Sequence, residues 1–247
     1  MSGKIKVLIV DDQEIIRKIL SRGLNSSGEI EVIGTAKDAF EARDKIVELS
    51  PDVLTLDVEM PKMNGLEFLK KLMPQYPVPV IMVSSHTLEG KAITLEALDA
   101  GAVDFVAKPD GSENGFEKTI LELTEKIILA SKVNVKRRLK KKELSPSVAF
   151  QKSFGKSGVS LIAIGASTGG TTAVKEIIEE FSNDMPPIVV VQHMPSGFTK
   201  LFAERLDNLC ELEVREACEG DKLVSGKVFI APGDKHVVVT ESLRSLY

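Results

Sequence analysis

The chain is organised around residues 53–65, which read VLTLDVEMPKMNG. An apolar run that reaches Asp57 and is followed by Met-Pro and Asn-Gly pairs is typical of a short buried strand that leads into a loop. We therefore expect Asp57 at the carboxyl end of a strand. This is the edge where open parallel sheets carry their chemistry.

Three further strand-like runs also end in polar residues. They are residues 5–10 before Asp11 and Asp12, residues 78–83 before Ser84, and residues 104–107 before Lys108. Carboxylates that meet at one edge repel one another and raise each other's pKa, so such a cluster needs a cation. Oxygen ligands suit Mg²⁺, and the predicted ligands are Asp11, Asp12, Asp57 and Glu59. A metal ion and Lys108 beside Asp57 suit phosphoryl transfer to that carboxylate.

Helical patterns alternate with these strands throughout the first half. Apolar residues at helical spacing predict helices over residues 13–25, 38–49, 65–73, 90–100 and 116–131, with a further strand over 31–35. This alternation predicts a doubly wound α/β domain with a parallel sheet.

Residues 4–129 resemble a response-regulator receiver domain, because the polar residues listed above stand at its motif positions. The resemblance implies a flavodoxin-like fold with a five-stranded parallel sheet. It further implies that a histidine kinase phosphorylates Asp57, with Mg²⁺ present, and that Ser84, Phe105 and Lys108 respond to the phosphoryl group.

Length and composition favour two domains that each bury a hydrophobic core, because the chain has 247 residues and 43% of them are hydrophobic. A net charge of −4 argues against a nucleic-acid-binding protein. Neither a signal peptide nor an apolar run of membrane-spanning length is present, so we expect a cytoplasmic protein that is not embedded in a membrane.

The composition changes at Lys132, where seven lysines and arginines occur within residues 132–142 without an acidic residue among them. This run reads as a basic linker, and the alternative is a contact surface for an acidic partner or nucleic acid. The predicted division is a receiver at 1–131, a linker at 132–157 and a second domain at 158–247.

The second domain opens with a strand-like run, residues 159–164, followed by GASTGG at 165–170 and a helical pattern over 171–181. The sequence around Ser167 matches the G-x-S-x-G pattern of a nucleophilic serine on a strand-to-helix turn. We expect the residues beside Ser167 to be small because a tight turn leaves no room for side chains. Free N–H groups at the helix start can stabilise an oxyanion.

Two other interpretations of this turn remain open. A dinucleotide-binding loop expects an acidic residue at the end of the next strand, but residues 188–191 lead into Gln192 and His193. Alternatively, Ser167 or Thr168 serves as an ordinary helix N-cap. His193 favours the nucleophile, because an imidazole at a neighbouring strand end can accept the proton of the serine.

The remaining patterns predict a helix over 198–209 and strands over 212–215, 227–231 and 236–240. The second domain is therefore also expected to be doubly wound α/β.

Three segments, residues 164–170, 191–195 and 230–236, resemble the chemotaxis protein-glutamate methylesterase (CheB) family. The resemblance implies a hydrolase that removes methyl groups from chemoreceptor glutamates, deamidates receptor glutamines and is activated by receiver phosphorylation. It makes Ser167 the nucleophile, His193 the general base and Thr168 the oxyanion donor. It implies no cofactor for the esterase, and its partners are a histidine kinase and a methylated chemoreceptor.

One departure concerns the aspartate that orients the histidine. The family pattern places it in a Gly-rich motif beyond Tyr247, so the esterase domain is expected to be incomplete, and neither Asp221 nor Asp234 is assigned to the triad. An alternative function is therefore a receiver-containing binding module, or phosphate sink, with an inactive esterase domain. A nucleic-acid output domain is disfavoured because residues 158–247 show no helix-turn-helix rhythm.

Overall fold

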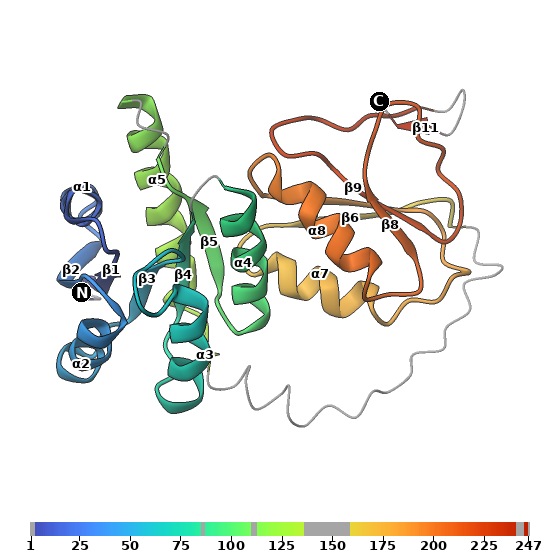
Figure 1. Ribbon diagram of the computed structural model, residues 1–247. Helices are drawn as coiled ribbons and strands as arrows, with labels where there is room; N and C mark the ends of the chain where they lie inside the picture. The colour runs from blue at the N-terminus through green and yellow to red at the C-terminus, as the bar shows by residue number, and fades with distance from the viewer. Residues whose placement is uncertain (1–2, 85–86, 110–112, 136–158, 241–244, 247) are drawn as a thin grey trace. The chain divides into compact units, whose positions relative to one another are not determined.

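The computed structural model describes residues 3–84, 87–109, 113–135, 159–240 and 245–246. The chain divides into two compact units, Met1–Ser145 and Pro146–Tyr247 (Figure 1). The predicted basic linker, 132–157, lies outside the described residues from position 136 onward. Its boundaries therefore remain predictions.

In the described part of the first unit, five strands alternate with five helices. The strands are β1 (Ile5–Val10), β2 (Ile30–Ala36), β3 (Val53–Asp57), β4 (Val80–Ser84) and β5 (Asp104–Ala107). The helices are α1 (Glu14–Ser26), α2 (Ala39–Leu49), α3 (Gly65–Gln75), α4 (Leu88–Asp99) and α5 (Glu113–Ala130). All strand pairs are parallel, in the order β2-β1-β3-β4-β5, which confirms the predicted receiver fold.

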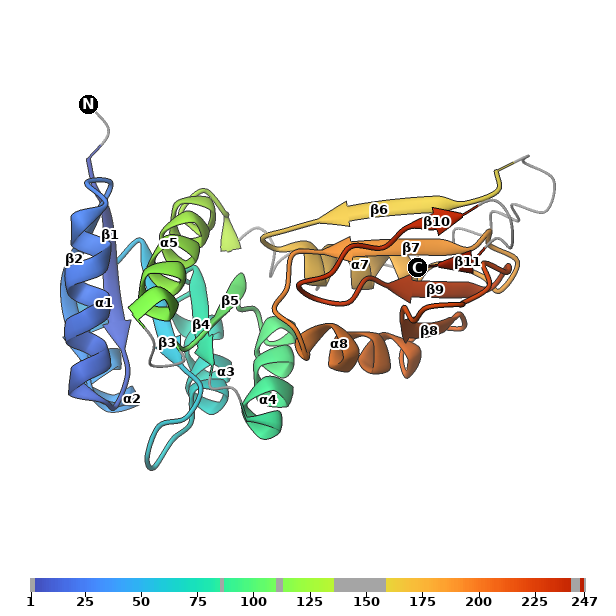
Figure 2. The ribbon, with the colours of Figure 1, turned by 90° about the horizontal axis from the view of Figure 1, so that it is seen from above.

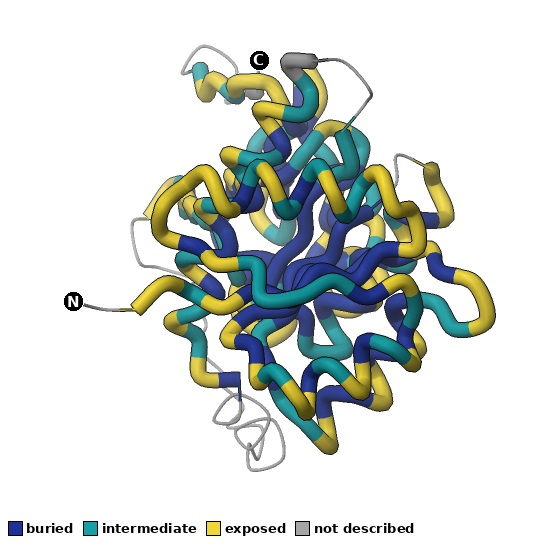
Figure 3. The backbone as a smooth tube through the Cα atoms, turned by 90° about the vertical axis from the view of Figure 1, so that its left-hand side faces the viewer, coloured by how far each residue is buried: buried dark blue, intermediate teal, exposed yellow. Residues whose placement is uncertain are grey.

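The core of the first unit lies along the central strands, where Leu8, Leu54 and Ile81 are fully buried. Figure 3 shows these strands as a buried band between more exposed helices. Helix α1 contacts α5, while α3 contacts both α2 and α4, so the helices form two layers. Burial on both faces explains why the strands read as continuous apolar runs.

The second unit holds a four-stranded parallel sheet in the order β6-β7-β9-β8. Its elements are β6 (Ile162–Ala166), α7 (Gly170–Ile178), β7 (Ile188–Gln192), α8 (Phe198–Asp207), β8 (Glu213–Glu216) and β9 (Lys227–Ile230). The predicted α/β class is confirmed. Strand β9 lies between β7 and β8. The edge strand β8 therefore comes earlier in the chain than β9, the strand that connects it to β7.

Helices α7 and α8 lie on the same face of this sheet (Figure 2). Thr199 of α8 donates a hydrogen bond to Glu216 of β8, and α7 begins against Gln192 of β7. On the opposite face, Val189 and Phe229 pack against Ala217 and three partly buried residues, Leu161, Leu223 and Val237. The connection between β8 and β9 therefore covers part of the face that the two helices leave open.

The strand predicted over residues 236–240 is shorter than expected. Only β10 (Val239–Thr240) is extended, and it pairs antiparallel with β11 (Ser245–Leu246). Val238 and Val239 remain 54% and 45% exposed. The β-branched run suggested a buried strand, but little of it is covered by the core.

Candidate functional site

The first unit brings together Asp11, Asp57 and Lys108. Because β1 pairs with β3 and Val10 lies opposite Leu56, Asp11 and Asp57 occupy adjacent strand ends. Lys108 follows β5, and its Nζ lies 2.7 Å from Asp57 Oδ2 and 3.1 Å from Asp11 Oδ2. Both carboxylates are almost completely buried, at 1% exposure or less. A partly buried cation thus neutralises part of a buried anionic pair.

The surroundings favour the protonated form of Asp57. Burial and the neighbouring Asp11 raise the pKa of Asp57 to about 7, while Lys108 opposes the shift. Burial also raises the pKa of Asp11, again against the effect of Lys108. For Lys108, burial lowers the pKa, but the two carboxylates outweigh it and the pKa is raised overall. The single positive charge of Lys108 therefore does not offset the cost of ionising both buried carboxylates.

Asp11, Asp12 and Asp57 fit a hard divalent cation. Each offers one carboxylate oxygen, and these oxygens lie within 4.8 Å of one another. Asp11 Oδ2 is buried, and the Lys108 ammonium that lies 3.1 Å from it is shared with Asp57. An oxygen-only set in which two buried carboxylates share one cation suits Mg²⁺. The carboxylate of Glu59 is not part of this group, and it accepts a hydrogen bond of 3.1 Å from Thr87 Oγ1.

Gly65 allows helix α3 to begin directly against the end of β3. A Cβ at this position would lie 2.1 Å from the carbonyl oxygen of Asp57. Asn64 caps the helix, and its Oδ1 accepts a hydrogen bond of 2.8 Å from the N–H of Glu67. The Asn-Gly pair therefore holds the Asp57 main chain in place.

Ser84 and Phe105 are both buried and contact neighbouring helices. Ser84 Oγ accepts a hydrogen bond of 2.6 Å from Thr94 Oγ1 of α4. The Phe105 ring centroid lies 5.3 Å from Nζ of Lys126 on α5. Neither Thr94 nor Lys126 was recognised from the sequence, because each reads as an ordinary helical residue until the strands are in register.

The second unit places Ser167 and His193 immediately beyond two paired strand ends. Ala166 of β6 lies opposite Gln192 of β7, and the N–H of His193 donates to the carbonyl of Ala166 at 2.9 Å. Neighbouring strands run about 4.8 Å apart. Ser167 and His193 are both exposed. The two residues are therefore neighbours at an accessible sheet edge.

The Ser167 hydroxyl lies in the turn after β6 and does not cap helix α7. The N-cap of α7 is Gly169, with φ 74°, and no side chain makes a capping hydrogen bond. The interpretation of Ser167 or Thr168 as the N-cap is therefore wrong. The N–H of Thr168 makes no hydrogen bond with any described residue, so it is available as a donor.

Of the three glycines near Ser167, Gly165, Gly169 and Gly170, only Gly170 lies in a space too small for a side chain. A Cβ on Gly170 would lie 2.5 Å from Gln192 Oε1 and 2.6 Å from Ala166 Cβ. A Cβ on Gly165 would meet nothing within 4 Å. The close packing is therefore on the α7 side of the turn.

Within the described part of the chain, no hydrogen bond joins the side chains of Ser167 and His193, and no carboxylate bonds to His193. Catalytic hydrogen bonds are often long before substrate binds. Asp221 is engaged elsewhere, because it accepts from Arg215 and from the N–H of Cys218. It therefore does not orient the imidazole.

The third motif, residues 230–236, packs beside the loop that follows His193. The N–H of Gly233 donates to Thr199 Oγ1 at 3.1 Å, and the N–H of Ala231 donates to the carbonyl of Val190 at 2.8 Å. Thr199 is fully buried. The fold thus gathers all three motifs at one end of the second sheet.

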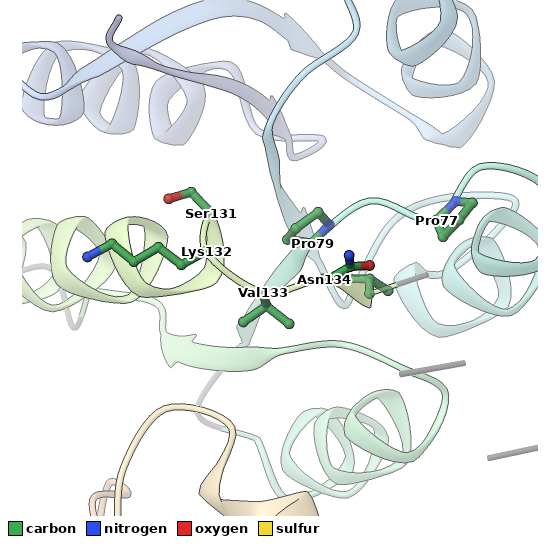
Figure 4. A pocket seen from close by; sticks show the side chains of 7 residues that line it. Pro77, Pro79, Ser131, Lys132, Val133 and Asn134 are labelled. Atoms are coloured by element: carbon green, nitrogen blue, oxygen red, sulfur yellow. The ribbon is translucent and has the colours of Figure 1, made fainter. Parts of the chain in front are cut away.

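A pocket of about 330 Å³ opens elsewhere in the first unit (Figure 4). It is lined by Pro77, Pro79 and residues 131–135. Pro79 directly precedes β4, whereas Asp57 is the last residue of β3. The pocket therefore lies at the amino ends of the strands, and the carboxylates lie at their carboxyl ends. It contains no pair of groups suited to acid–base chemistry.

The described helices include none that is both long and apolar enough to cross a lipid bilayer.

Comparison with known proteins gives two family matches. A CheB methylesterase model matches residues 162–246, and a response regulator receiver domain model matches residues 7–119. A solved response regulator domain of Thermotoga maritima CheB has 49% identity and covers 53% of this chain and 98% of its own, with a TM-score of 0.49.

Two full-length relatives extend the similarity over both units. A protein-glutamate methylesterase/protein-glutamine glutaminase of Syntrophotalea carbinolica is 52% identical over 98% of this chain and 70% of its own length. A protein of the same description from Sulfurimonas denitrificans is 50% identical over 95% of this chain and 68% of its own length. The chain therefore belongs to the protein-glutamate methylesterase/protein-glutamine glutaminase family, the CheB methylesterases with a receiver domain.

Proposed function

We propose that this chain is a phosphorylation-controlled protein-glutamate methylesterase of bacterial chemotaxis, with glutamine deamidase activity on the same receptors. The observation that carries the proposal is the pairing of β6 with β7, because it makes Ser167 and His193 neighbours at one exposed edge. The partners would be a histidine kinase and a methylated chemoreceptor, and the protein would act in the cytoplasm.

In the receiver, Asp57 would accept the phosphoryl group by in-line attack of a carboxylate oxygen on phosphorus, as the P–N bond to the phosphohistidine of the kinase breaks and its imidazole leaves. Asp11, Asp12 and Asp57 would hold Mg²⁺, which would supply positive charge for the phosphoryl oxygens. Lys108 would keep its contact with the anionic cluster while its partner carboxylate becomes an acyl phosphate. Ser84 and Phe105 would then change position. Glu59 has no metal-binding role in this proposal.

In the esterase, Ser167 Oγ would attack the carbonyl carbon of the glutamyl methyl ester while His193 takes the serine proton. The N–H of Thr168 would stabilise the oxyanion that forms. Collapse of the intermediate would expel methanol, with the proton returned by His193. Water, activated by the same imidazole, would then cleave the glutamyl-serine ester and release the free carboxylate.

The test is methanol release from a methylated chemoreceptor by the full chain, with Mg²⁺ and a small phosphodonor. We expect release that the phosphodonor stimulates, that Ser167→Ala abolishes and that Asp57→Asn reduces to the unstimulated rate. Full activity of Ser167→Ala would refute the nucleophile. Equal rates with and without phosphodonor would refute the control by phosphorylation.

A second candidate is a receiver-containing binding module with an inactive esterase domain. It is favoured by the lack of a carboxylate on His193 among the described residues. By analogy with serine hydrolases, such a lack costs about 10⁴-fold in rate. Phosphorylation of Asp57 without any methanol release would select this candidate.

A further inference from the structure

The side chain of Gln192 lies between the main chains of Ser167 and His193. Gln192 is the last residue of β7 and is 7% exposed. Its Nε2 donates to the carbonyl of Ser167 at 3.0 Å and to the carbonyl of His193 at 3.3 Å. One amide group thus bridges the two residues to which the proposed function assigns nucleophile and base.

The orientation of this amide follows from its partners. Both carbonyl oxygens can only accept, so the nitrogen must face them and Oε1 must face away. Oε1 points to the start of α7, and a Cβ on Gly170 would lie only 2.5 Å from it. The absence of a side chain at position 170 therefore leaves the space that Gln192 needs.

The bridge closes a small network across the two strand ends. The N–H of His193 donates to the carbonyl of Ala166, and the N–H of Gly170 donates to the carbonyl of Ser167 at 2.7 Å. Among the described residues, the amide of Gln192 adds the side-chain link between the turn at Ser167 and the carbonyl of His193. The relative position of the two loops is then set by a buried and rigid group.

Stability alone does not explain a glutamine at this position. Oε1 is buried and accepts no hydrogen bond from any residue that the structure describes. A buried acceptor without a donor is unfavourable, and this cost offsets part of the stability that the two donated hydrogen bonds contribute. A group that is retained despite such a cost calls for a reason other than packing.

We propose that Gln192 is a positioning residue that fixes the distance between the Ser167 turn and the His193 loop. The inference rests on the proposed function, since it gives those two residues their roles. Gln192 touches no reacting atom, and it acts by holding two main-chain carbonyls at one separation. Imidazole and hydroxyl then need little reorganisation to reach each other when substrate binds.

The test uses Gln192→Met, which keeps the length of the side chain and removes both donated hydrogen bonds, in the full chain. Gln192→Leu provides a second apolar replacement. Gln75→Leu is a control for the loss of a side-chain hydrogen bond alone, because Nε2 of the exposed Gln75 also donates to a main-chain carbonyl, that of Lys71, within α3 of the first unit. The readouts are the rate of covalent labelling of Ser167 by a fluorophosphonate, kcat and KM for methanol release, and thermal unfolding.

We expect both Gln192 variants to lower the labelling rate and kcat by about 10- to 100-fold, with KM changed less than about threefold. The unfolding midpoint should change little, because the loss of two hydrogen bonds is offset by removal of the unsatisfied Oε1, and Gln75→Leu should behave as wild type. Labelling at the wild-type rate in both variants would overturn the inference. A fall in the unfolding midpoint that parallels the fall in rate would mean that Gln192 serves packing and stability, and it would overturn the positioning role.

Failure of the proposed function gives a different pattern. Methanol release that survives Ser167→Ala would refute the nucleophile and, with it, the role of Gln192. Release that needs Ser167 but is indifferent to Gln192 would refute this inference alone. Labelling depends on Ser167 reactivity without a receptor, so it tests Gln192 even where no methanol is released.

Discussion

The proton on Asp57 links the chemistry of the receiver to its stability. The pKa of Asp57 rises from 3.8 to about 7 on folding, first through burial and then through the charge of Asp11. A group with a raised folded-state pKa binds its proton more tightly in the folded protein. Its contribution to stability is therefore present at low pH and is lost as the pH rises from 3.8 through about 7.

Because the raised pKa means that ionised Asp57 destabilises the folded protein, we predict that Asp57→Asn stabilises the protein above neutral pH when Mg²⁺ is absent. We expect the free energy of unfolding at pH 8 to exceed that of wild type by about 2 kcal/mol, because asparagine carries no buried charge. The gain should shrink as the pH is lowered toward 5. Urea unfolding across this pH range measures it. A difference that does not vary with pH would contradict the assigned pKa shift.

At this scale, the sequence predicted residues whose chemistry is visible in their position. Asp11, Asp57 and Lys108 each follow a strand-like run, and parallel strands share one chemical edge. The sequence shows Gln192 only as a non-acidic residue at the end of a strand-like run. Its contacts depend on the register of β6 against β7, and no local pattern contains that information.

At the scale of elements, we expect an added methyl group to destabilise the protein at Gly65 but not at Gly165. Gly65→Ala would press a Cβ against the main chain of Asp57, whereas Gly165→Ala would enter open space. We expect the first to lower the free energy of unfolding by about 2 kcal/mol or more, and the second to leave it nearly unchanged. Urea unfolding of both variants tests this pair. Equal effects would mean that the β3–α3 junction relaxes.

Helix α5 is fixed to β5 through Lys126, which is 3% exposed. Its Nζ contacts Asp104 at 3.2 Å, Glu122 at 2.9 Å and the carbonyl of Phe105 at 2.6 Å. Lys126→Met would leave the buried carboxylate of Asp104 without this cation, and we expect a loss of about 3 kcal/mol. Lys118→Met, an exposed change on the same helix, should be silent in the same unfolding experiment. A silent Lys126→Met would mean that Asp104 finds another donor.

Element boundaries in the first unit followed closely from apolar periodicity, since burial on both faces makes each strand a clear apolar run. The strand order of the second sheet was not predictable from the same patterns. Strand β9 follows β8 in the chain but separates it from β7 in space. The connection that permits this, residues 217–226, has no helical pattern, and its role in covering Phe229 depends on the finished sheet.

At the scale of the whole chain, we predict that the dependence on Mg²⁺ arises in the first unit. The only carboxylate cluster of ligating geometry found in the described residues is Asp11, Asp12 and Asp57. We expect removal of Mg²⁺ by a chelator to stop phosphorylation of Asp57. Fluorophosphonate labelling of Ser167 without a phosphodonor should continue at its former rate. Mass spectrometry of both sites measures the two outcomes, and a labelling rate that falls with the metal would contradict the assignment.

The place of β9 has a consequence for how the nascent chain matures on the ribosome. Among the described strands, β8 pairs with β9, which follows it in the chain, so β8 emerges from the exit tunnel before its partner does. Helix α8 can hold it meanwhile, because Asp207 accepts from the N–H of Val214 at 2.7 Å and Thr199 bonds to Glu216. When the residues before Lys227 have emerged, the second unit would then hold a β6–β7 half and a separate α8–β8 half. Emergence of the four residues of β9 joins the two halves in one late step.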